Sequence, residues 1–463
     1  MSGKSMVKSK KVYKNVAFLT LGCKVNTYET DAMEKKFRQS GFNIVSVDDV
    51  ADIIIINTCT VTNMADRKSR QIIHRMKKKN PDAIVVATGC YVQAAKEKVL
   101  EDSSVDIAVG NNKKQDIVAI VKDYLNDRTH NSAIIDINSK CDYEEMTIDD
   151  NQMHTRAYVK IQDGCNQFCS YCIIPYARGR IRSRKMEDII NEVTNLANNG
   201  YKEIVITGIH LSSYGLDFEH DDTFTSTDYN PFMYKYLIKL LEEMSKVKGI
   251  ERIRLGSLEP RIITNEFLED LSANKKICPH FHLSLQSGCD ETLKRMNRKY
   301  TCEVYMNGLN LLRKYFDNPA ITTDVIVGFP KEDENEFEQT TNFLKECNFS
   351  MIHVFKYSRR KGTVADKMDG QIDEQIKTQR SAQLLNLTAS QHKKYMESFI
   401  GKKEKVLFEE IVNIDGHDYF VGHNERYVKI AVDKDGVRAN DILNVTIKKQ
   451  LSEDVMYGEI CKK

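Results

Sequence analysis

Short apolar runs alternate with amphipathic stretches in the first part of the chain. NVAFLTLGC, ADIIIINTC and DAIVVATGC are rich in β-branched residues and end at Cys23, Cys59 and Cys90. Helical patterns such as TDAMEKKFRQSG and ADRKSRQIIHRMKKKN lie between them. Near-continuous apolar strands that alternate with helices predict a parallel α/β sheet. We assign this domain to residues 11–125, with a fourth strand at VDIAVG and a polar linker after it.

The same alternation continues over residues 151–390. Six strands are predicted, at AYVKIQDG, EIVITGIH, RIRLGSLEP, FHLSLQSG, ITTDVIVGFP and MIHVFKY. Six strand–helix units predict a partial (β/α)6 barrel of the TIM type. The polar stretch 217–230 is expected to be a surface insertion. From about Phe399, short alternating strands broken by Gly, Asn and Asp predict a small all-β barrel over residues 399–462.

Length and composition narrow the class of protein. A chain of 463 residues is too long for one ordinary core, so two or three domains are expected. The sequence has no apolar run near the roughly 20 residues that span a bilayer, and its basic start lacks the apolar region of a secretory signal. We therefore expect a cytoplasmic protein without a membrane partner. The net charge of +2 does not by itself indicate nucleic acid.

The stretch GCNQFCSYCIIPYARG contains three cysteines in a Cys-x3-Cys-x2-Cys spacing. They are Cys165, Cys169 and Cys172, and no fourth cysteine or histidine follows closely. Three thiolates on a 4Fe–4S cluster leave one iron open to a substrate or cofactor. The alternatives are a zinc site completed by a distant residue, and ordinary loop cysteines. Disulfides are not expected among the 12 cysteines of a chain without an export signal.

Cys23, Cys59 and Cys90 form a second, dispersed trio. Each ends a predicted strand, and the carboxyl ends of parallel strands line up along one edge, where ligand crevices form. Three thiolates from separate strands would thus converge on one site. The alternative is three buried core cysteines. The other six cysteines show no such spacing and are interpreted as core or incidental thiols: Cys141, Cys278, Cys289, Cys302, Cys347 and Cys461.

With these motifs the chain resembles the radical S-adenosylmethionine (SAM) methylthiotransferases. The likeness runs from about Lys11 to Glu459, and the tail resembles the small barrel called the TRAM domain. LGCKVNTYET, NTCTVTNMAD and TGCYVQ are similar to the three motifs of the family's first domain. The family pattern is not matched everywhere, because Lys331 stands where a glycine commonly follows Gly-Phe-Pro.

The resemblance implies two 4Fe–4S clusters, each with three cysteine ligands. Cys165, Cys169 and Cys172 would hold the cluster whose open iron binds SAM, and Cys23, Cys59 and Cys90 would hold an auxiliary cluster. Asn26 and Thr58 would support the auxiliary cluster through hydrogen bonds. The residues that the resemblance places near SAM, or at the barrel mouth, are Gly208, Ser257, Glu259, Gln286 and Ser287.

The resemblance also implies a reaction and its partners. The string through Arg178 and Gly179 is similar to enzymes that add a methylthio group to C2 of N6-threonylcarbamoyladenosine at position 37, beside the tRNA anticodon. In the family, electron transfer to SAM gives a 5′-deoxyadenosyl radical, and a second SAM methylates sulfur on the auxiliary cluster. The implied partners are SAM, the tRNA anticodon stem-loop and a low-potential electron donor such as flavodoxin or ferredoxin.

Other functions remain open at this point. The substrate alternatives are isopentenyladenosine in tRNA and an aspartate of a ribosomal protein. Another radical SAM enzyme would use the second cluster only for electron transfer, and a non-catalytic zinc protein would bind RNA through its tail. The basic runs RKSR and HRMKKKN are either a solvated helix face or contacts to phosphate.

Overall fold

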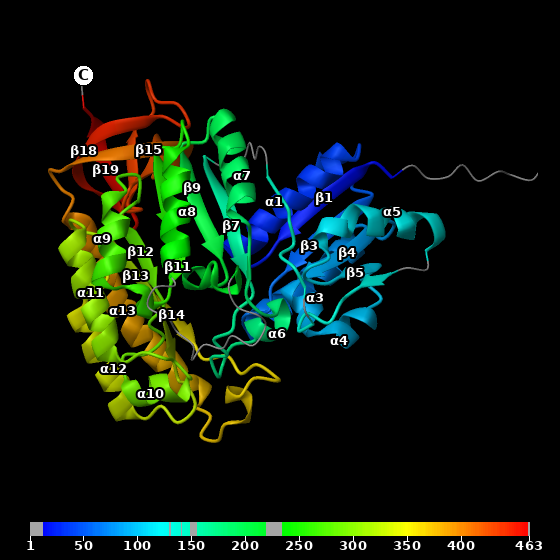
Figure 1. The fold of residues 1–463 in the computed structure, drawn as a ribbon, viewed down its shortest axis with the longest axis horizontal. Coiled ribbons are helices and arrows are strands. Elements are labelled where there is room, and N and C mark those ends of the chain that lie inside the picture. The colour runs from blue at the N-terminus through cyan, green and yellow to red at the C-terminus, as the bar shows by residue number, and fades with distance from the viewer. Residues whose placement is uncertain (1–12, 129–130, 140, 149–154, 219–233, 462–463) are drawn as a thin grey trace, which may run out of the picture. The chain divides into compact units, whose positions relative to one another are not determined.

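The computed structural model describes residues 13–128, 131–139, 141–148, 155–218 and 234–461 (Figure 1). These residues form two compact units. The first contains residues up to 137 together with 144–146, and the second contains 138–143 and the chain from 147 onward. No helix among the described residues combines the length and the apolar character needed to cross a membrane.

The first unit is a six-stranded sheet, and every strand pairing in it is parallel, as predicted. The strands are β1 (Asn15–Thr20), β2 (Asn43–Val45), β3 (Ile53–Thr58), β4 (Ile84–Gly89), β5 (Ile107–Val109) and β6 (Ser132–Ala133). The helices are α1 (Lys24–Gln39), α2 (Asn63–Lys79), α3 (Cys90–Ala94), α4 (Lys96–Leu100), η1 (Lys114–Asp116) and α5 (Ile117–Asp127).

Strand β3 shows why the apolar runs are continuous. Ile53 and Ile55 pack in a cluster with Phe37 of α1. Ile54 and Ile56 pack on the other face in a cluster with Ile73 of α2. A strand that is covered by helices on both faces has no solvent side, so its sequence does not alternate.

The strand order of this sheet reverses between β1 and β3. The order is β2-β1-β3-β4-β5-β6, so the chain first moves outward from β1 to β2 and then returns to β3. Loops that follow neighbouring strands diverge at such a reversal and leave a crevice at the carboxyl edge of the sheet. Cys23 and Cys59 follow the two strands that flank this reversal.

The second unit begins with the predicted partial barrel. All six predicted strands are present, in two sheets ordered β10-β9-β7-β8 and β11-β12-β13-β14. Only Gly256 separates β10 from β11, so the third predicted strand contributes to both sheets. The strands are β7 (Arg156–Asp163), β8 (Arg182–Ser183), β9 (Glu203–Gly208), β10 (Arg252–Leu255), β11 (Ser257–Leu258), β12 (His280–Leu283), β13 (Ala320–Val327) and β14 (Met351–Lys356).

Helices follow the barrel strands. They are α6 (Ile174–Arg178), α7 (Met186–Asn198), η2 (Leu211–Ser213), η3 (Leu216–Phe218), α8 (Tyr234–Lys246), η4 (Pro260–Ile262), α9 (Asn265–Ala273), α10 (Asp290–Arg295), α11 (Cys302–Tyr315), α12 (Glu334–Cys347), η5 (Ala365–Lys367) and α13 (Glu374–Glu397). Most of the insertion predicted at 217–230 lies outside the described residues.

The tail is a closed barrel, as the all-β prediction required. Its strands pair in the order β15-β16-β17-β19-β18, and β18 also pairs with β15. They are β15 (Lys403–Ile414), β16 (His417–Asn424), β17 (Lys429–Asp433), β18 (Ile442–Ser452) and β19 (Val455–Ile460).

Tyr427 of the tail docks against the amino ends of the core strands. The guanidinium groups of Arg156 and Arg254 each lie 4.9 Å from the centre of its ring. Arg156 also contacts the Glu409 carboxylate at 3.1 Å, and Arg254 donates to Glu203 at 2.7 Å. Since Arg156 is the first residue of β7, the tail barrel contacts the end of the core that is opposite to the cysteine loop after Asp163.

Lys331 has the backbone conformation of a glycine. Its φ is +66°, and its side chain is exposed. A residue with a side chain loses about 1–2 kcal/mol of stability in this left-handed region. Glycine avoids this loss, but it makes the unfolded chain more flexible, which lowers the stability by about 0.4–1 kcal/mol. We therefore expect Lys331→Gly to raise the free energy of unfolding by roughly 0.5–1 kcal/mol. Urea titration measures this change. Lys331→Ala keeps the strained conformation and should give no gain; an equal gain from both variants would contradict the explanation.

Candidate active site

Gly164 and Cys165 open a loop whose two ends are joined. The Cys165 backbone N–H donates to the Gly179 carbonyl at 3.1 Å, so the loop from 165 to 179 closes on itself. Gly164 has a φ of +71°, and a Cβ at this position would lie 1.8 Å from the Arg180 carbonyl oxygen. Only glycine fits here, because any side chain would push the two ends of the loop apart.

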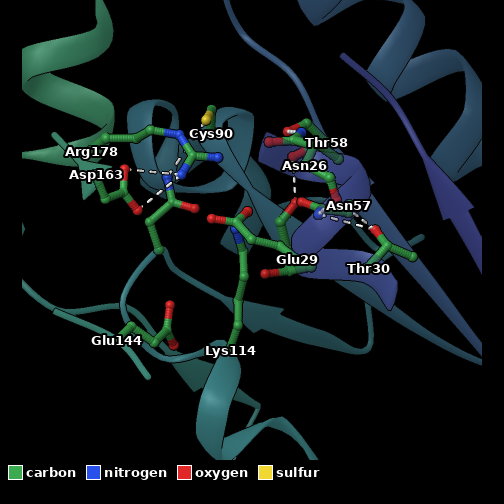
Figure 2. A network of polar contacts seen from close by, with 12 residues as sticks. Asn26, Glu29, Thr30, Asn57, Thr58, Cys90, Lys114, Glu144, Asp163 and Arg178 are labelled. Carbon is green, nitrogen blue, oxygen red and sulfur yellow. Dashed lines mark hydrogen bonds and ion pairs between the residues drawn. The ribbon is translucent and has the colours of Figure 1, made fainter. Parts of the chain in front are cut away.

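A buried carboxylate anchors the base of this loop. Asp163 accepts two hydrogen bonds of 3.1 Å from Arg178 (Figure 2). It accepts a third, of 2.6 Å, from Lys160. It also accepts the Gly164 backbone N–H at 2.8 Å. Arg178 is fully buried, and its charge is balanced by this carboxylate. The arginine of the quoted motif therefore fixes the loop rather than facing solvent.

The segment Arg295–Arg298 forms hydrogen bonds with the cysteine loop. Ser170 donates its hydroxyl to the Arg295 carbonyl at 2.8 Å and its backbone N–H to the Met296 carbonyl at 3.0 Å. Asn297 donates from its side chain to the Phe168 carbonyl at 2.9 Å. The segment Arg295–Arg298 thus positions the residues on both sides of Cys169.

A cation faces the cysteine thiols. Arg298 donates to the Cys169 sulfur at 3.2 Å and to the Tyr300 hydroxyl at 2.9 Å. Burial raises the pKa of the Cys165 thiol to about 12, and the nearby Cys169 adds to the shift. Burial likewise raises the pKa of Cys172. Iron must therefore displace protons from these thiols when it binds, and Arg298 would then neutralise part of the thiolate charge.

Removing this cation should make a bound cluster harder to reduce. The reduced cluster is the more negative form, so we expect Arg298→Gln to lower its reduction potential, by about 60 mV for each ~1.4 kcal/mol lost. Redox titration followed by electron paramagnetic resonance measures the shift. Arg298→Lys keeps the charge and should recover most of the potential. Arg313→Gln, which removes an arginine bonded to the Cys347 and Asn348 carbonyls, should have no effect. An unchanged potential in Arg298→Gln would contradict this role.

The predicted SAM residues lie at the ends of successive barrel strands or shortly after them. Glu259 is buried and accepts from the Arg261 side chain at 2.7 Å. Arg261 in turn contacts the Gln167 side chain at 3.4 Å, which connects the third strand to the cysteine loop. Ser257 is exposed. The third barrel strand thus carries an exposed residue, Ser257, and is followed by the Glu259 carboxylate, which Arg261 holds in place.

Gly208 and Gln286 serve close backbone packing. A Cβ on Gly208 would lie 3.2 Å from both Gln162 oxygens, so this glycine admits the Gln162 side chain. Gln286 adopts a φ of +74°, and its backbone N–H donates to the Asp324 carbonyl at 2.8 Å. A non-glycine residue in this region is strained and is often found at functional sites.

Ser287 does not face the barrel mouth, and that expectation was wrong. It is buried, and its hydroxyl lies 3.2 Å from Thr340 on α12. The hydroxyl also accepts the Cys289 backbone N–H at 3.3 Å. The side chain therefore ties the strand end to an outer helix.

His210 is a site residue that sequence reasoning missed. It is nearly neutral at physiological pH, because burial lowers its pKa to about 3 and the nearby Arg298 and Arg261 add to the effect. Its Nδ1 lies 2.5 Å from the Ser213 hydroxyl, and its buried Nε2 has no hydrogen-bond partner within the described part of the chain. A buried nitrogen without a partner is costly, so it is suited to a polar cofactor.

The second cysteine trio lies at the carboxyl edge of the first unit's sheet, where the strand order predicts a crevice. Cys23 follows β1 directly before α1, Cys59 follows β3, and Cys90 follows β4. Cys23 is exposed, whereas Cys59 and Cys90 are buried. A Cβ on Gly22 would lie 2.9 Å from the Cys59 sulfur, so the loop that carries Cys23 rests against Cys59.

Hydrogen bonds from buried amides fix the loops around this trio. Asn26 donates to the Leu21 carbonyl at 2.7 Å and to the Thr58 carbonyl at 3.0 Å. Asn57 donates to the Asn26 carbonyl at 3.0 Å (Figure 2). Asn111 donates to the Cys90 sulfur at 3.6 Å. Lys114 and Glu29 form a buried ion pair in the same unit. These contacts are of the kind that orients metal ligands.

Both trios fit a large cofactor better than a single ion. In the described parts of the chain, no three cysteine sulfurs lie within 4.8 Å of one another, although ligands of one zinc ion would. An iron–sulfur cluster spreads its thiolates over separate irons. The donor type, the spacing and the surrounding hydrogen-bond donors therefore fit the two predicted clusters.

Comparisons with known proteins agree with this interpretation. The family described as "Radical SAM superfamily" matches residues 159–344, and "Uncharacterized protein family UPF0004" matches residues 15–110. The "Threonylcarbamoyladenosine tRNA methylthiotransferase MtaB" of Bacillus subtilis is 42% identical, covering 90% of this chain and 89% of the relative. The protein of the same name from Aquifex aeolicus is 40% identical, covering 90% and 98%.

A relative with a different name and a solved structure are also similar to this chain. A "tRNA-2-methylthio-N(6)-dimethylallyladenosine synthase" of Thermodesulfovibrio yellowstonii is 35% identical, covering 93% of this chain and 95% of the relative. Among solved structures, the radical SAM methyltransferase TsrM of Kitasatospora setae with a bound [4Fe-4S] cluster gives a TM-score of 0.54 at 13% identity. It covers 76% of this chain and 77% of that one, and it supports the fold alone.

Proposed function

Because the chain belongs to the radical SAM methylthiotransferase family, we propose that it transfers a methylthio group to C2 of N6-threonylcarbamoyladenosine in tRNA. The product is 2-methylthio-N6-threonylcarbamoyladenosine at position 37, beside the anticodon. The observation that carries the proposal is 42% identity to a relative named for this activity, along nearly the whole of both chains. A dimethylallyladenosine synthase is 35% identical, and the relative of Thermotoga maritima that is named MtaB is 34% identical, so the proposal depends on the two relatives at 40–42%.

Each cysteine trio has a separate task in this proposal. Cys165, Cys169 and Cys172 hold the cluster that binds SAM, and Cys23, Cys59 and Cys90 hold the auxiliary cluster. When bound, the clusters and SAM supply the radical and the methylthio group. Asp163, Arg178 and the segment Arg295–Arg298 hold the first loop, so the protein's part is to position these cofactors.

Contacts to SAM are assigned to the barrel loops. Gly208, Ser257, Glu259 and Gln286 are the residues that the sequence placed there, and His210 is added for its buried nitrogen. The functional divisions proposed are 11–125 for the auxiliary cluster, 151–390 for radical chemistry and 399–462 for RNA. A neutral His210 is suited to SAM because it adds no positive charge beside a sulfonium.

The remaining partners follow from the reaction. The anticodon stem-loop of tRNA would enter with the target base splayed out, as sequence-specific RNA recognition requires. Exposed cations on α2, namely Arg67, Lys68, Arg75 and Lys78, are proposed phosphate contacts. A low-potential donor such as flavodoxin or ferredoxin would deliver the electron. The cytoplasm, where tRNA is modified, is the proposed location.

Mass spectrometry of tRNA nucleosides tests the proposal. Cells that lack this gene should lose 2-methylthio-N6-threonylcarbamoyladenosine and accumulate the precursor without the methylthio group. Restoring the gene should reverse both changes. If that nucleoside were unaffected while 2-methylthio-isopentenyladenosine disappeared, the substrate would be isopentenyladenosine. If neither changed, an aspartate of a ribosomal protein would be the substrate to examine.

A further inference from the structure

Two histidines and an aspartate meet on three neighbouring strands of the partial barrel. They are His282 on β12, Asp324 on β13 and His353 on β14. Their ligand atoms all lie within 4.8 Å of one another, and no other trio of His, Cys, Asp or Glu in the described residues does so. None of the three was singled out by the sequence, because they are separated by 42 and 29 positions and form no local motif.

The triad lies on the face of the strands that points away from the outer helices. Parallel register pairs His282 with Thr322 and Asp324 with His353, so all four side chains share one face. The opposite face is covered: Phe281 packs on Phe316, with ring centres 4.8 Å apart, and the Ile352 side chain is buried. Helices α11, α12 and α13 lie along that outer side in Figure 1. The triad therefore faces the barrel interior.

The distances within the triad fit a metal ion. His282 Nε2 lies 3.3 Å from the Asp324 carboxylate. Two ligand atoms bound about 2.0–2.2 Å from one tetrahedral ion lie roughly 3.3–3.6 Å apart. The His353 ring stacks on His282 with centres 6.0 Å apart and an angle of 29°, and its ligand nitrogen lies within 4.8 Å of the other two ligand atoms.

The surroundings of His282 orient it as a ligand. Its Nδ1 lies 2.9 Å from the Thr322 hydroxyl, so Nδ1 carries the hydrogen bond and Nε2 is directed toward Asp324. Metal-binding histidines usually have such a partner on the second nitrogen. The His282 side chain is 15% exposed and that of Asp324 is 32% exposed, so water and an ion can reach them.

We propose that His282, Asp324 and His353 bind a divalent transition-metal ion, of the class of Zn²⁺ or Fe²⁺, inside the barrel. Two imidazoles and one carboxylate suit borderline ions of this class and leave positions open for further ligands. The site shares no ligand with either cysteine trio. Asp324 connects the site to Gln286, because the Gln286 backbone N–H donates to the Asp324 carbonyl. The proposal does not depend on the substrate of the enzyme.

Zinc binding by the enzyme with both clusters reconstituted tests the site. The holoenzyme is freed of loose metal and equilibrated anaerobically with graded Zn²⁺, and zinc and iron per chain are measured. We expect one zinc per chain without loss of iron. His353→Gln removes a ligand from an exposed position and should weaken zinc binding by more than 100-fold, since an outer partner alone is worth roughly 10–100-fold. Thr322→Val removes only such an outer partner and should weaken zinc binding by roughly 10–100-fold.

A matched control separates this site from ordinary surface pairs. His417 is exposed like His353 and lies 3.4 Å from Asp433 in the tail, outside any metal-binding trio of the described residues. His417→Gln should leave the zinc affinity unchanged. The proposal is overturned if the holoenzyme binds no zinc, if zinc enters only as iron leaves, or if His353→Gln and His417→Gln weaken binding equally.

Discussion

Replacement of Cys169 by alanine is expected to reduce SAM cleavage by at least about 100-fold, the cost of misplacing a reacting group by about 1 Å. Cys169 is the thiol that Arg298 contacts. Its two neighbours in the chain are also held, because the Phe168 carbonyl accepts from Asn297 and the Ser170 hydroxyl donates to the Arg295 carbonyl. Without it, only Cys165 and Cys172 remain to hold the cluster. The product 5′-deoxyadenosine, measured with dithionite as reductant, reports the loss, and iron per chain should fall by roughly half.

The loop in this variant should stay folded. Asp163 and the Cys165–Gly179 backbone bond fix its two ends independently of the Cys169 side chain. Cys302→Ala is the matched control, because Cys302 is partly exposed in the same unit and is assigned no ligand role. Its SAM cleavage and iron content should equal those of the parent enzyme. Full SAM cleavage by Cys169→Ala would show that this trio does not hold the radical cluster.

Replacement of Cys23 by alanine should separate the two reactions. We expect SAM cleavage to 5′-deoxyadenosine to continue while methylthiolation of RNA falls by at least about 100-fold, since the sulfur donor is no longer held in reach. Cys23 stands at the start of α1 but makes no side-chain capping hydrogen bond, so alanine removes no cap. Mass spectrometry of the RNA product and of 5′-deoxyadenosine from one reaction measures both activities.

Cys141→Ala provides the comparison for this variant, since Cys141 is a partly exposed cysteine without an assigned role. It should retain both activities. If Cys23→Ala lost SAM cleavage as well, in a protein that keeps the iron of the first cluster, separate tasks for the two trios would be ruled out. If it kept methylthiolation, Cys23 would not be a ligand of the auxiliary cluster.

Much of the fold was predictable because its signals are local. The run Ile53–Ile56 is buried on both faces, and such runs indicate parallel strands wherever they occur. The Cys-x3-Cys-x2-Cys spacing is contained in eight residues. The strands β2 and β6 were missed because three and two residues carry no pattern. The 24-residue helix α13 was also not predicted; its buried residues include Lys377, Arg380 and Gln391, which blur its apolar face.

The candidate site was predictable only in its ligands. Ser170 bonds to Arg295 across 125 positions, and Arg298 reaches Cys169 across 129. Contacts of this separation leave no spacing to read in a single sequence. For the same reason His210 was passed over: its neighbours Arg261 and Arg298 are distant along the chain, and only burial makes its ring unusual. Ser287 was misplaced because alternation along a strand does not hold beyond the strand's last residue.

The docking of the tail sets a minimum size for any RNA that binds both the tail and the cysteine loop. Strand β7 begins at Arg156, which contacts the tail, and ends at Asp163, directly before the cysteine loop. Seven residue steps of about 3.3 Å separate these points by about 23 Å. A free nucleoside is too small to cover that span. An RNA that engages both the tail and the cysteine loop must therefore be several nucleotides long, because the length of β7 fixes the distance between the two places.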